Sequence, residues 1–527
     1  MEHKAGKDAC AKAMELYLVT DNTPAILGQR QLVNVVTKAL KGGVTCVQLR
    51  DKTSETIDMI SMAKKLHAVT KQFNVPLLIN DRVDVALAAG ADGVHIGQDD
   101  IDLKTARKLL GDKAIIGVTV CSNAEAQKAV EGGANYVGIG TMFATPTKEN
   151  TKSVIGTAGT RDILTFLGEV GPKLATVAIG GINASNIQRV IYQSKSPSQG
   201  LDGVAVVSAI VGAKDAEAAS AELKKLLETP PAFIHWDSST ATTKDLQQLL
   251  NAIPSIVKRV VDTTPLTHNM TNTVVQNFSA NVALAIGASP IMSTAPNEAA
   301  DLAALNGGLL INMGTLTTTT RAAYTTALKA YNTAGNPVVF DPVGAGATTL
   351  RRTTVKHLMS SGYFTVIKGN SNEILTVADP TEHQAQQRGV DSTPHDPTTN
   401  LNKTATVIKS LAQKERTTIL MTGAIDILSN GTLTLAIKNG HEYLGLITGS
   451  GCALGTVIAA FLAVCPEDPL LATLAAVLLF EIAAENAVGR ADVMGPGTFV
   501  PAFLDCLYGL TRKGVRGEDA KVEVLDM

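Results

Sequence analysis

The stretch PLLINDRVDVALAAGADGVHIG, residues 76–97, sets the pattern for the first half of the chain. An apolar run of strand length at 76–80 is followed by a short segment of helical periodicity at 83–89 and a second apolar run at 93–97. Apolar runs without polar alternation are typical of parallel strands that are buried on both faces. The stretch therefore predicts two parallel strands joined by a helix.

Similar runs recur through the first 210 residues, and helical segments separate most of them. The helical periodicity is clearest at 55–73, 101–110, 122–131 and 213–228. Eight such units closed into a ring bury every strand and leave no sheet edge. We therefore predict a (β/α)8 TIM barrel, with an open doubly wound sheet as the structural alternative. The eight runs are 16–20, 43–49, 76–80, 93–97, 114–119, 135–140, 175–180 and 203–208.

A change of texture near residue 232 indicates a domain boundary. Paired prolines in TPPAF (229–233) stop the preceding helix, and the polar stretch WDSSTATT (236–243) follows as a linker candidate. We predict one domain at 1–232 and a second at 238–527. Beyond the boundary, long alanine-rich helical segments alternate with strands such as GLLINMG and PVVFDPVG, which favours a three-layer α/β/α domain around a central sheet.

Composition excludes several classes of protein. Of the 527 residues, 45% are hydrophobic, which is enough to form a buried core and excludes a disordered chain. The net charge is −2 and the basic residues are scattered, so we expect no nucleic-acid or membrane partner. The apolar stretches at 452–465 and 469–480 are too short to span a bilayer, and the N-terminus lacks an apolar signal region. Six cysteines without CxxC spacing suit a cytoplasmic enzyme with small-molecule partners.

Polar residues gather where the predicted strands of the first half end. In a βα barrel these ends face one common site. Carboxylates and cations together suit Mg²⁺ that bridges phosphate oxygens. The last two units end in Gly180-Gly181 and in Val207-Ser208, which suits phosphate bound by backbone N–H groups. Local alternatives remain open: helix N-caps for the aspartates and a tight turn for the glycines. The residues are Gln48, Arg50, Lys52, Asn80, Asp81, Gln98, Asp99, Asp100, Thr145, Thr147, Lys148, Gly180, Gly181, Val207 and Ser208.

Five motifs resemble those of the thiamine phosphate synthases over about residues 16–212. They are QLRDK (48–52), INDRVD (79–84), GVHIGQDD (93–100), TPTK (145–148) and IGGI (179–182). The resemblance implies a TIM barrel that joins hydroxymethylpyrimidine diphosphate to a thiazole phosphate and releases diphosphate. This chemistry needs no protein nucleophile, and we interpret His95, inside a strand, as a core histidine.

The same resemblance implies a role for each matching residue. The pyrimidine diphosphate would contact the amide, cationic and hydroxyl side chains, the thiazole phosphate would lie at the later strands, and Mg²⁺ would bind to two aspartates. The pyrimidine set is Gln48, Arg50, Lys52, Asn80, Thr119 and Lys148; the thiazole phosphate set is Thr145, Thr147, Gly181, Val207 and Ser208, with Lys148 beside it; the metal set is Asp81 and Asp100.

The second half contains a glycine motif, TGSGC (448–452), directly before an apolar helical segment. Glycines at a helix start expose N–H groups, and the positive end of the helix favours a phosphoryl group. The motif matches neither a Walker A loop nor GxGxxG, and a plain helix entry is the alternative. Two further motifs follow predicted strands: DPVGAG (341–346) and NSNE (370–373), whose glutamate suits Mg²⁺ on ATP.

These features resemble the ribokinase-like superfamily and, within it, hydroxyethylthiazole kinases over about residues 240–510. The further motifs are NFSAN (277–281), GASPIM (287–292) and GPGTF (495–499). The resemblance implies phosphorylation of a thiazole alcohol by ATP. By position, Met292 and Gly449 would contact the alcohol, Lys368 and Thr422 the ATP, and Glu373 the Mg²⁺.

Cys452 stands at the place of a catalytic base in related kinases. A helix start lowers the pKa of a thiol, which favours a thiolate base; the alternative is a small buried residue that lines the site. Both interpretations remain open from the sequence.

The two resemblances fit each other, because the product of the kinase would be the substrate of the synthase. A fusion in this order resembles the bifunctional thiamine-biosynthesis enzymes of fungi. Related kinases imply a homo-oligomer, a trimer or hexamer. A bifunctional enzyme with a different heteroaromatic alcohol and a non-catalytic ligand sensor are the rival hypotheses. We interpret the polar stretch 382–400 as a surface loop.

Overall fold

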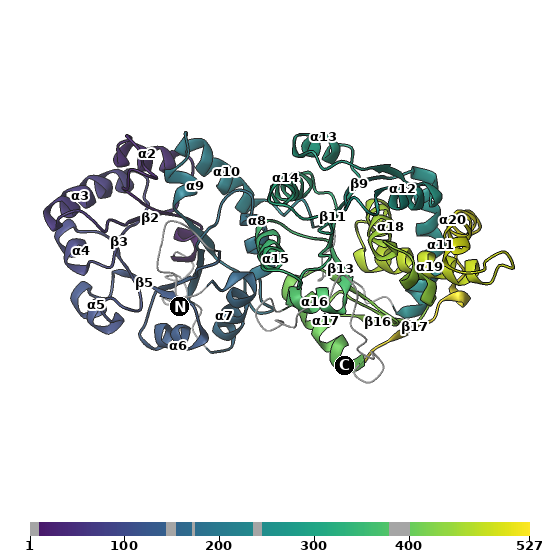
Figure 1. Ribbon diagram of the computed structural model, residues 1–527. Helices are drawn as coiled ribbons and strands as arrows, with labels where there is room; N and C mark the ends of the chain where they lie inside the picture. Colours follow the sequence, from purple (N-terminus) through teal and green to yellow (C-terminus); the bar gives the residue numbers. More distant parts are fainter. Residues whose placement is uncertain (1–9, 144–153, 171–173, 235–244, 379–400, 527) are drawn as a thin grey trace. The chain divides into compact units, whose positions relative to one another are not determined.

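The computed structural model describes residues 10–143, 154–170, 174–234, 245–378 and 401–526 (Figure 1). The chain divides into two compact units, Met1–Pro231 and Ala232–Met527. The linker candidate and the stretch 382–400 lie outside the described residues.

The first unit is a closed barrel of eight parallel strands in sequential order, which confirms the predicted fold. Its helices surround the ring of strands (Figure 1). The strands are β1 (Leu16–Val19), β2 (Cys46–Leu49), β3 (Leu77–Asn80), β4 (Gly93–Ile96), β5 (Ile115–Val120), β6 (Tyr136–Ile139), β7 (Ala175–Ile179) and β8 (Gly203–Val206). The helices are α2 (Leu32–Lys41), α3 (Thr56–Gln72), α4 (Val83–Ala89), α5 (Leu103–Leu110), α6 (Asn123–Glu131), α7 (Gly156–Val170), α8 (Ile187–Ser194), α9 (Ser208–Val211) and α10 (Ala216–Glu228).

Alternate residues of each barrel strand belong to different cores. In β1, Leu16 and Leu18 pack toward the helices, whereas Tyr17 and Val19 belong to the cluster inside the ring. This alternation follows from the two-residue period of a strand. The interior cluster includes two tyrosines, Tyr17 and Tyr136, so the barrel interior carries hydroxyl groups as well as apolar side chains.

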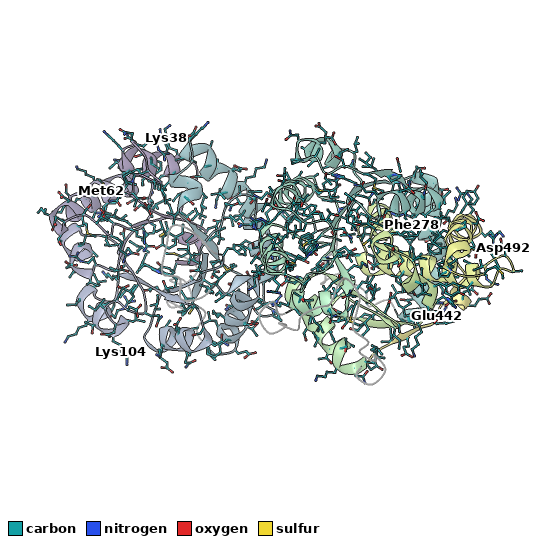
Figure 2. The ribbon with its side chains drawn as sticks, viewed as in Figure 1. Lys38, Met62, Lys104, Phe278, Glu442 and Asp492 are labelled. Carbon is teal, nitrogen blue, oxygen red and sulfur yellow. The ribbon has the colours of Figure 1, made fainter. Side chains whose placement is uncertain are left out.

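The outer helices present polar side chains to solvent. Lys38 of α2 and Lys104 of α5 are exposed, and both lie on the outer ring in Figure 2. The functional side chains of this unit must therefore come from the strand ends rather than from the helices.

The second unit is built on a nine-stranded mixed sheet in the order β10-β9-β11-β12-β13-β14-β15-β16-β17. The strands from β10 to β14 are parallel, and the last three pair antiparallel. The strands are β9 (Leu266–Met270), β10 (Ser289–Ile291), β11 (Gly308–Asn312), β12 (Val338–Asp341), β13 (Val366–Asn370), β14 (Thr418–Thr422), β15 (Asp426–Ser429), β16 (Thr434–Ile437) and β17 (Val522–Val524).

Helices cover both faces of this sheet, which confirms the three-layer prediction. Leu310 and Val339 face one helical layer, and their strand neighbours Leu309 and Phe340 face the other. The first layer holds α11 (Leu246–Thr263), α12 (Gln276–Ala285), α18 (Ser450–Val464), α19 (Pro469–Val488) and α20 (Pro496–Lys513). The second holds α13 (Ala299–Ala303), α14 (Thr318–Ala334), α15 (Thr349–Ser361), α16 (Ser371–Ala378) and α17 (Leu401–Glu415).

Among the described residues, α19 alone is long and apolar enough to cross a bilayer. In the structure 83% of its apolar window is buried, and the helix packs against α18 and α20. Asp468 caps its start by accepting a hydrogen bond from the backbone N of Leu471. Its apolar surface therefore belongs to the core of the second unit.

Candidate active sites

The carboxyl ends of the barrel strands enclose a cavity of about 540 Å³. Thr145, Thr147 and Lys148 lie outside the described residues. In the structure, the other predicted residues of this unit line this one cavity. The residues that line the cavity are Gln48, Arg50, Lys52, Asn80, Asp81, Asp100, Thr119, Gly181, Val207 and Ser208.

Neither aspartate of the acidic wall is a helix cap. Asp81 has a backbone φ of 61° and forms an ion pair with Lys52 Nζ. Asp100 Oδ2 accepts a hydrogen bond from the backbone N of Gly97 at 2.7 Å, while Asp102 caps α5. The left-handed backbone at Asp81 is uncommon for a residue other than glycine and is a typical feature of functional loops.

The two aspartates influence each other. Burial, and then hydrogen bonding with Asp81, raises the pKa of Asp100 above its ordinary value. A site that holds two carboxylates this close favours a divalent cation, because oxygen ligands are those that Mg²⁺ prefers. In the described part of the chain, no group of three or more acidic, histidine or cysteine side chains is arranged to hold a metal ion by itself. Phosphate oxygens and water would have to complete the coordination.

Arg50 has a partner that sequence reasoning missed. Arg50 Nη1 lies 3.7 Å from Asp21 Oδ2, and the Asp21 side chain is only 4% exposed. Asp21 comes two residues after the end of β1, so its position at a strand end was the signal that could have found it. The pair keeps the guanidinium at the cavity wall.

Two side-chain amides form the floor beside the acidic wall. Gln48 Nε2 donates to Asn80 Oδ1 at 2.7 Å, and Gln48 Oε1 accepts from Tyr17 Oη at 3.1 Å. The interpretation of His95 as a core histidine was incomplete. Its ring hydrogen-bonds inside the barrel as expected, but it also lines the cavity and contacts Thr119 Oγ1 at 2.8 Å.

The opposite wall consists of backbone. Gly180 and Gly181 have φ values of 109° and 68°, which residues other than glycine rarely adopt. Val207 directly precedes α9, whose first residue is Ser208. Exposed N–H groups at this wall suit a phosphate, and positive φ also suits the tight turn that we considered.

The start of α18 forms the candidate site of the second unit. Gly449 precedes the helix with a φ of 86°, and a Cβ there would overlap Val275 Cγ2. Cys452 is the third helical residue. Met292 directly follows β10, and Thr422 Oγ1 donates to the carbonyl oxygen of Gly369 at 3.3 Å.

A buried polar network lies beneath this helix start. Lys368 Nζ is 3.4 Å from Asp341 Oδ2, which also accepts from Asn312 Nδ2 at 2.8 Å. Asn272 Nδ2 lies 3.1 Å from Asn312 Oδ1 and 3.4 Å from Cys452 Sγ. The thiol therefore belongs to a hydrogen-bonded set that contains one cation and one carboxylate.

Of the two interpretations of Cys452, the structure favours the buried residue that lines the site. Burial, and then the negative charge of Asp341, raises the pKa of the thiol to about 11. These effects exceed the lowering by Lys368 and by the hydrogen bonds from Asn312 and Asn272, so the thiol holds its proton at neutral pH. The sequence did not reveal this because burial of the thiol depends on the packing of α18.

Glu373 occupies a backbone cradle. Its carboxylate accepts hydrogen bonds from the backbone N of Gly344 and of Asn370, both at 2.8 Å. Burial, and then Asp341, raises the pKa of Glu373 to about 7. A buried carboxylate close to a second one fits a divalent cation that neutralises both.

Two family models match the chain, one in each unit. Residues 16–210 match the thiamine monophosphate synthase family, and residues 257–513 match the hydroxyethylthiazole kinase family. A probable thiamine biosynthetic bifunctional enzyme of Schizosaccharomyces pombe is 44% identical over 96% of this chain and 98% of its own length. The chain belongs to the family of thiamine biosynthetic bifunctional enzymes.

A second bifunctional relative and one solved structure are also similar to this chain. The thiamine biosynthetic bifunctional enzyme of Saccharomyces cerevisiae is 37% identical over 94% of this chain and 95% of its own length. A structure of a hydroxyethylthiazole kinase protein from Pyrococcus horikoshii is 35% identical and covers 52% of this chain and 100% of its own, with a TM-score of 0.45. Membership of this bifunctional family implies small-molecule substrates and, for the kinase unit, use of ATP.

Proposed function

We propose that this bifunctional enzyme carries out two successive steps of thiamine assembly. The second unit phosphorylates 4-methyl-5-(2-hydroxyethyl)thiazole with ATP. The first unit condenses the thiazole phosphate with 4-amino-2-methyl-5-hydroxymethylpyrimidine diphosphate, giving thiamine phosphate and diphosphate. The observation that supports the proposal most strongly is a cavity lined by residues that follow or end the strands around the barrel rim.

The charges of this cavity suit a diphosphate leaving group. Arg50 and Lys52 would bind its oxygens, and Asp81 and Asp100 would hold the Mg²⁺ that neutralises it when bound. The amides of Gln48 and Asn80 would orient the pyrimidine, with Thr119 beside them. Cleavage leaves a cation that the aminopyrimidine stabilises, and the thiazole nitrogen captures it. No protein group has to act as a nucleophile.

The remaining predicted residues would hold the thiazole phosphate. Gly181, Val207 and Ser208 supply backbone N–H groups and a hydroxyl at the opposite wall. From the sequence resemblance, further contacts are proposed for Thr145, Thr147 and Lys148, with Lys148 also binding the pyrimidine diphosphate.

In the second unit, the alcohol would lie between Met292 and Gly449, at the start of α18. Lys368 and Thr422 are proposed to contact ATP, and Glu373 to hold Mg²⁺, which would offset charge on the phosphates. With its pKa near 11, the Cys452 thiol is better suited to line the alcohol site than to remove its proton. Its neighbour Asn272 orients the sulfur.

We further propose domain limits of 1–232 and 238–527, a homo-oligomeric assembly, trimer or hexamer, and a cytoplasmic location. No nucleic-acid or membrane partner is part of the proposal. The domain limits are tested by expressing each segment alone and measuring its own reaction. Sedimentation of the full chain tests the assembly.

The decisive experiment supplies thiazole alcohol, ATP, Mg²⁺ and the pyrimidine diphosphate to the purified chain. Thiamine phosphate is the expected product, and omission of ATP should stop its formation unless thiazole phosphate replaces the alcohol. Thiazole phosphate as the end product would refute the synthase step. Turnover of a different heteroaromatic alcohol alone would support the rival bifunctional enzyme, and binding without any turnover would support the sensor.

A further inference from the structure

A continuous chain of hydrogen bonds runs through the barrel interior and links two sides of the synthase cavity. Tyr17 Oη and Tyr136 Oη are 2.8 Å apart, and Tyr136 Oη lies 2.7 Å from His95 Nδ1. His95 Nε2 contacts Thr119 at one end, and Tyr17 contacts Gln48 at the other. The chain therefore crosses from β5 through β4, β6 and β1 to β2.

The barrel is shaped around this chain. A Cβ at Gly117 would overlap the ring of Tyr136, and a Cβ at Gly138 would lie 2.9 Å from His95 Cε1. The rings of Tyr17 and Tyr136 meet edge to face with centroids 5.9 Å apart. Both tyrosines are buried, and His95 is only 9% exposed. Glycine at the two facing positions gives the rings the room that any other residue would take.

The hydrogen bonds between these side chains all run in one donor-to-acceptor direction, because each hydroxyl has one proton to donate. The carbonyl oxygen of Gln48 can only accept, so Tyr17 donates to it and must itself accept from Tyr136. Tyr136 then accepts from His95 Nδ1–H, and in a neutral imidazole this tautomer has Nε2 as the acceptor for the Thr119 hydroxyl. Burial raises the pKa of both tyrosines well above the ordinary value, so both keep their protons.

This direction fixes what the cavity offers at each end. The Thr119 proton points inward, so its oxygen faces the cavity as an acceptor. At the other end, Gln48 Nε2 donates to Asn80 Oδ1. Asn80 Nδ2 has no hydrogen-bond partner among the described residues and is left to donate.

We infer that Tyr17, Tyr136 and His95 are positioning residues that make Thr119 an acceptor and Asn80 a donor, and so select an aminopyrimidine. The inference rests on the proposed synthase reaction. An aminopyrimidine edge carries an N–H donor beside a ring nitrogen acceptor, which complements this pair. A 4-oxo pyrimidine carries the reverse pattern and would leave buried polar groups unpaired, a defect that sites of this kind reject strongly.

The test compares two unreactive ligands. The 4-amino pyrimidine monophosphate and its 4-oxo counterpart are used as competitive inhibitors of thiamine phosphate formation. Wild type should prefer the amino compound by about tenfold or more, a difference typical of one paired polar group. In Tyr136→Phe and in Tyr17→Phe the direction is no longer fixed, and the preference should fall to about threefold or less.

Tyr17→Phe is the sharper variant, because Tyr17 contacts neither His95 Nε2 nor Thr119. Thr119→Ser keeps a hydroxyl and should keep the preference for the amino compound. Tyr192→Phe is the matched control, because it removes a tyrosine hydroxyl of α8 that does not belong to the hydrogen-bonded chain. Thermal unfolding of each variant establishes that the barrel is folded.

Three outcomes would overturn the inference. They are a wild type without preference, an unchanged preference in folded Tyr17→Phe, and an equal loss of preference in Tyr192→Phe. A wild type that forms no thiamine phosphate would instead refute the proposed function. Turnover by wild type together with unchanged preference in the variants would refute the positioning chain alone.

Discussion

Lys368 Nζ lies 3.4 Å from Asp341 Oδ2 in the core of the second unit, where the two side chains are only 4% and 1% exposed. Removing the cation leaves a carboxylate buried without its ion-pair partner, which in proteins typically costs about 3–5 kcal/mol. We expect Lys368→Met to abolish kinase activity and to lower the unfolding temperature, while synthase activity assayed with thiazole phosphate persists. Lys356→Met, an exposed lysine of α15, is the control. Unfolding of Lys368→Met at the wild-type temperature would contradict the prediction.

Cys452 is expected to line the kinase site without acting as the base. Because burial raises the pKa of its thiol to about 11, loss of the sulfur should reduce kcat by less than about tenfold and leave the pH profile of kcat unchanged. Cys452→Asp introduces a carboxylate at the same place and should be at least as active as wild type. Steady-state kinetics between pH 6 and 9 check both. A thousandfold loss of kcat in Cys452→Ala would contradict the prediction and support the hypothesis of a thiolate base.

Asp100 should be important for synthase activity but not for stability. Burial and its neighbour Asp81 raise the pKa of Asp100, so Asp100→Asn relieves repulsion and should leave the unfolding temperature equal or higher. The same variant should lose synthase activity by about 100-fold, since one metal ligand is gone. Asp102→Ala removes a helix cap instead and should show the reverse pattern: lower stability with synthase activity kept.

Stability of the second unit should fall as pH rises through weakly acidic values. Burial raises the pKa of Asp426 from the ordinary 3.8 to about 6, and burial followed by Asp426 raises that of Glu481. The folded state therefore binds more protons than the unfolded state, and the stabilising contribution is complete below pH 4 and lost as pH rises toward 6 and beyond.

Glu481→Gln removes the part of this dependence that comes from Glu481. Relative to wild type, the variant should gain on the order of 1–2 kcal/mol between pH 5 and pH 7.5. Differential scanning calorimetry of the full chain at both pH values measures the gain. Glu442→Gln, at the position labelled in Figure 2, is the control because its side chain is exposed and should give no gain. An equal effect of both variants would contradict the assignment to the buried pair.

The fold and the outer ring of the synthase site could be predicted because parallel strands place their carboxyl ends together. Asp81, Asp100 and Gly181 are far apart in the chain, yet each follows a strand, and that placement alone brings them to one cavity. The same rule applied to Asp21 would have found the partner of Arg50.

The interior could not be predicted in the same way. Contact between Tyr17 and Tyr136 depends on the register of β1 and β6 around the closed ring, and no local pattern encodes it. The raised pKa of Cys452 has a similar origin, since it depends on how completely α18 and Asp341 enclose the sulfur. Strand ends are local features of a sequence, whereas burial is a property of the assembled core.

The close contact between Gly117 and the ring of Tyr136 restricts how these two positions can change in evolution. A methyl group there would collide with the ring of Tyr136, so the glycine can be exchanged only after the tyrosine has become smaller. The two positions are 19 residues apart along the chain but should be inherited as a pair. An alanine at 117 in a related sequence would therefore indicate that the interior tyrosine is gone, and with it the means of choosing between an amino and an oxo substrate.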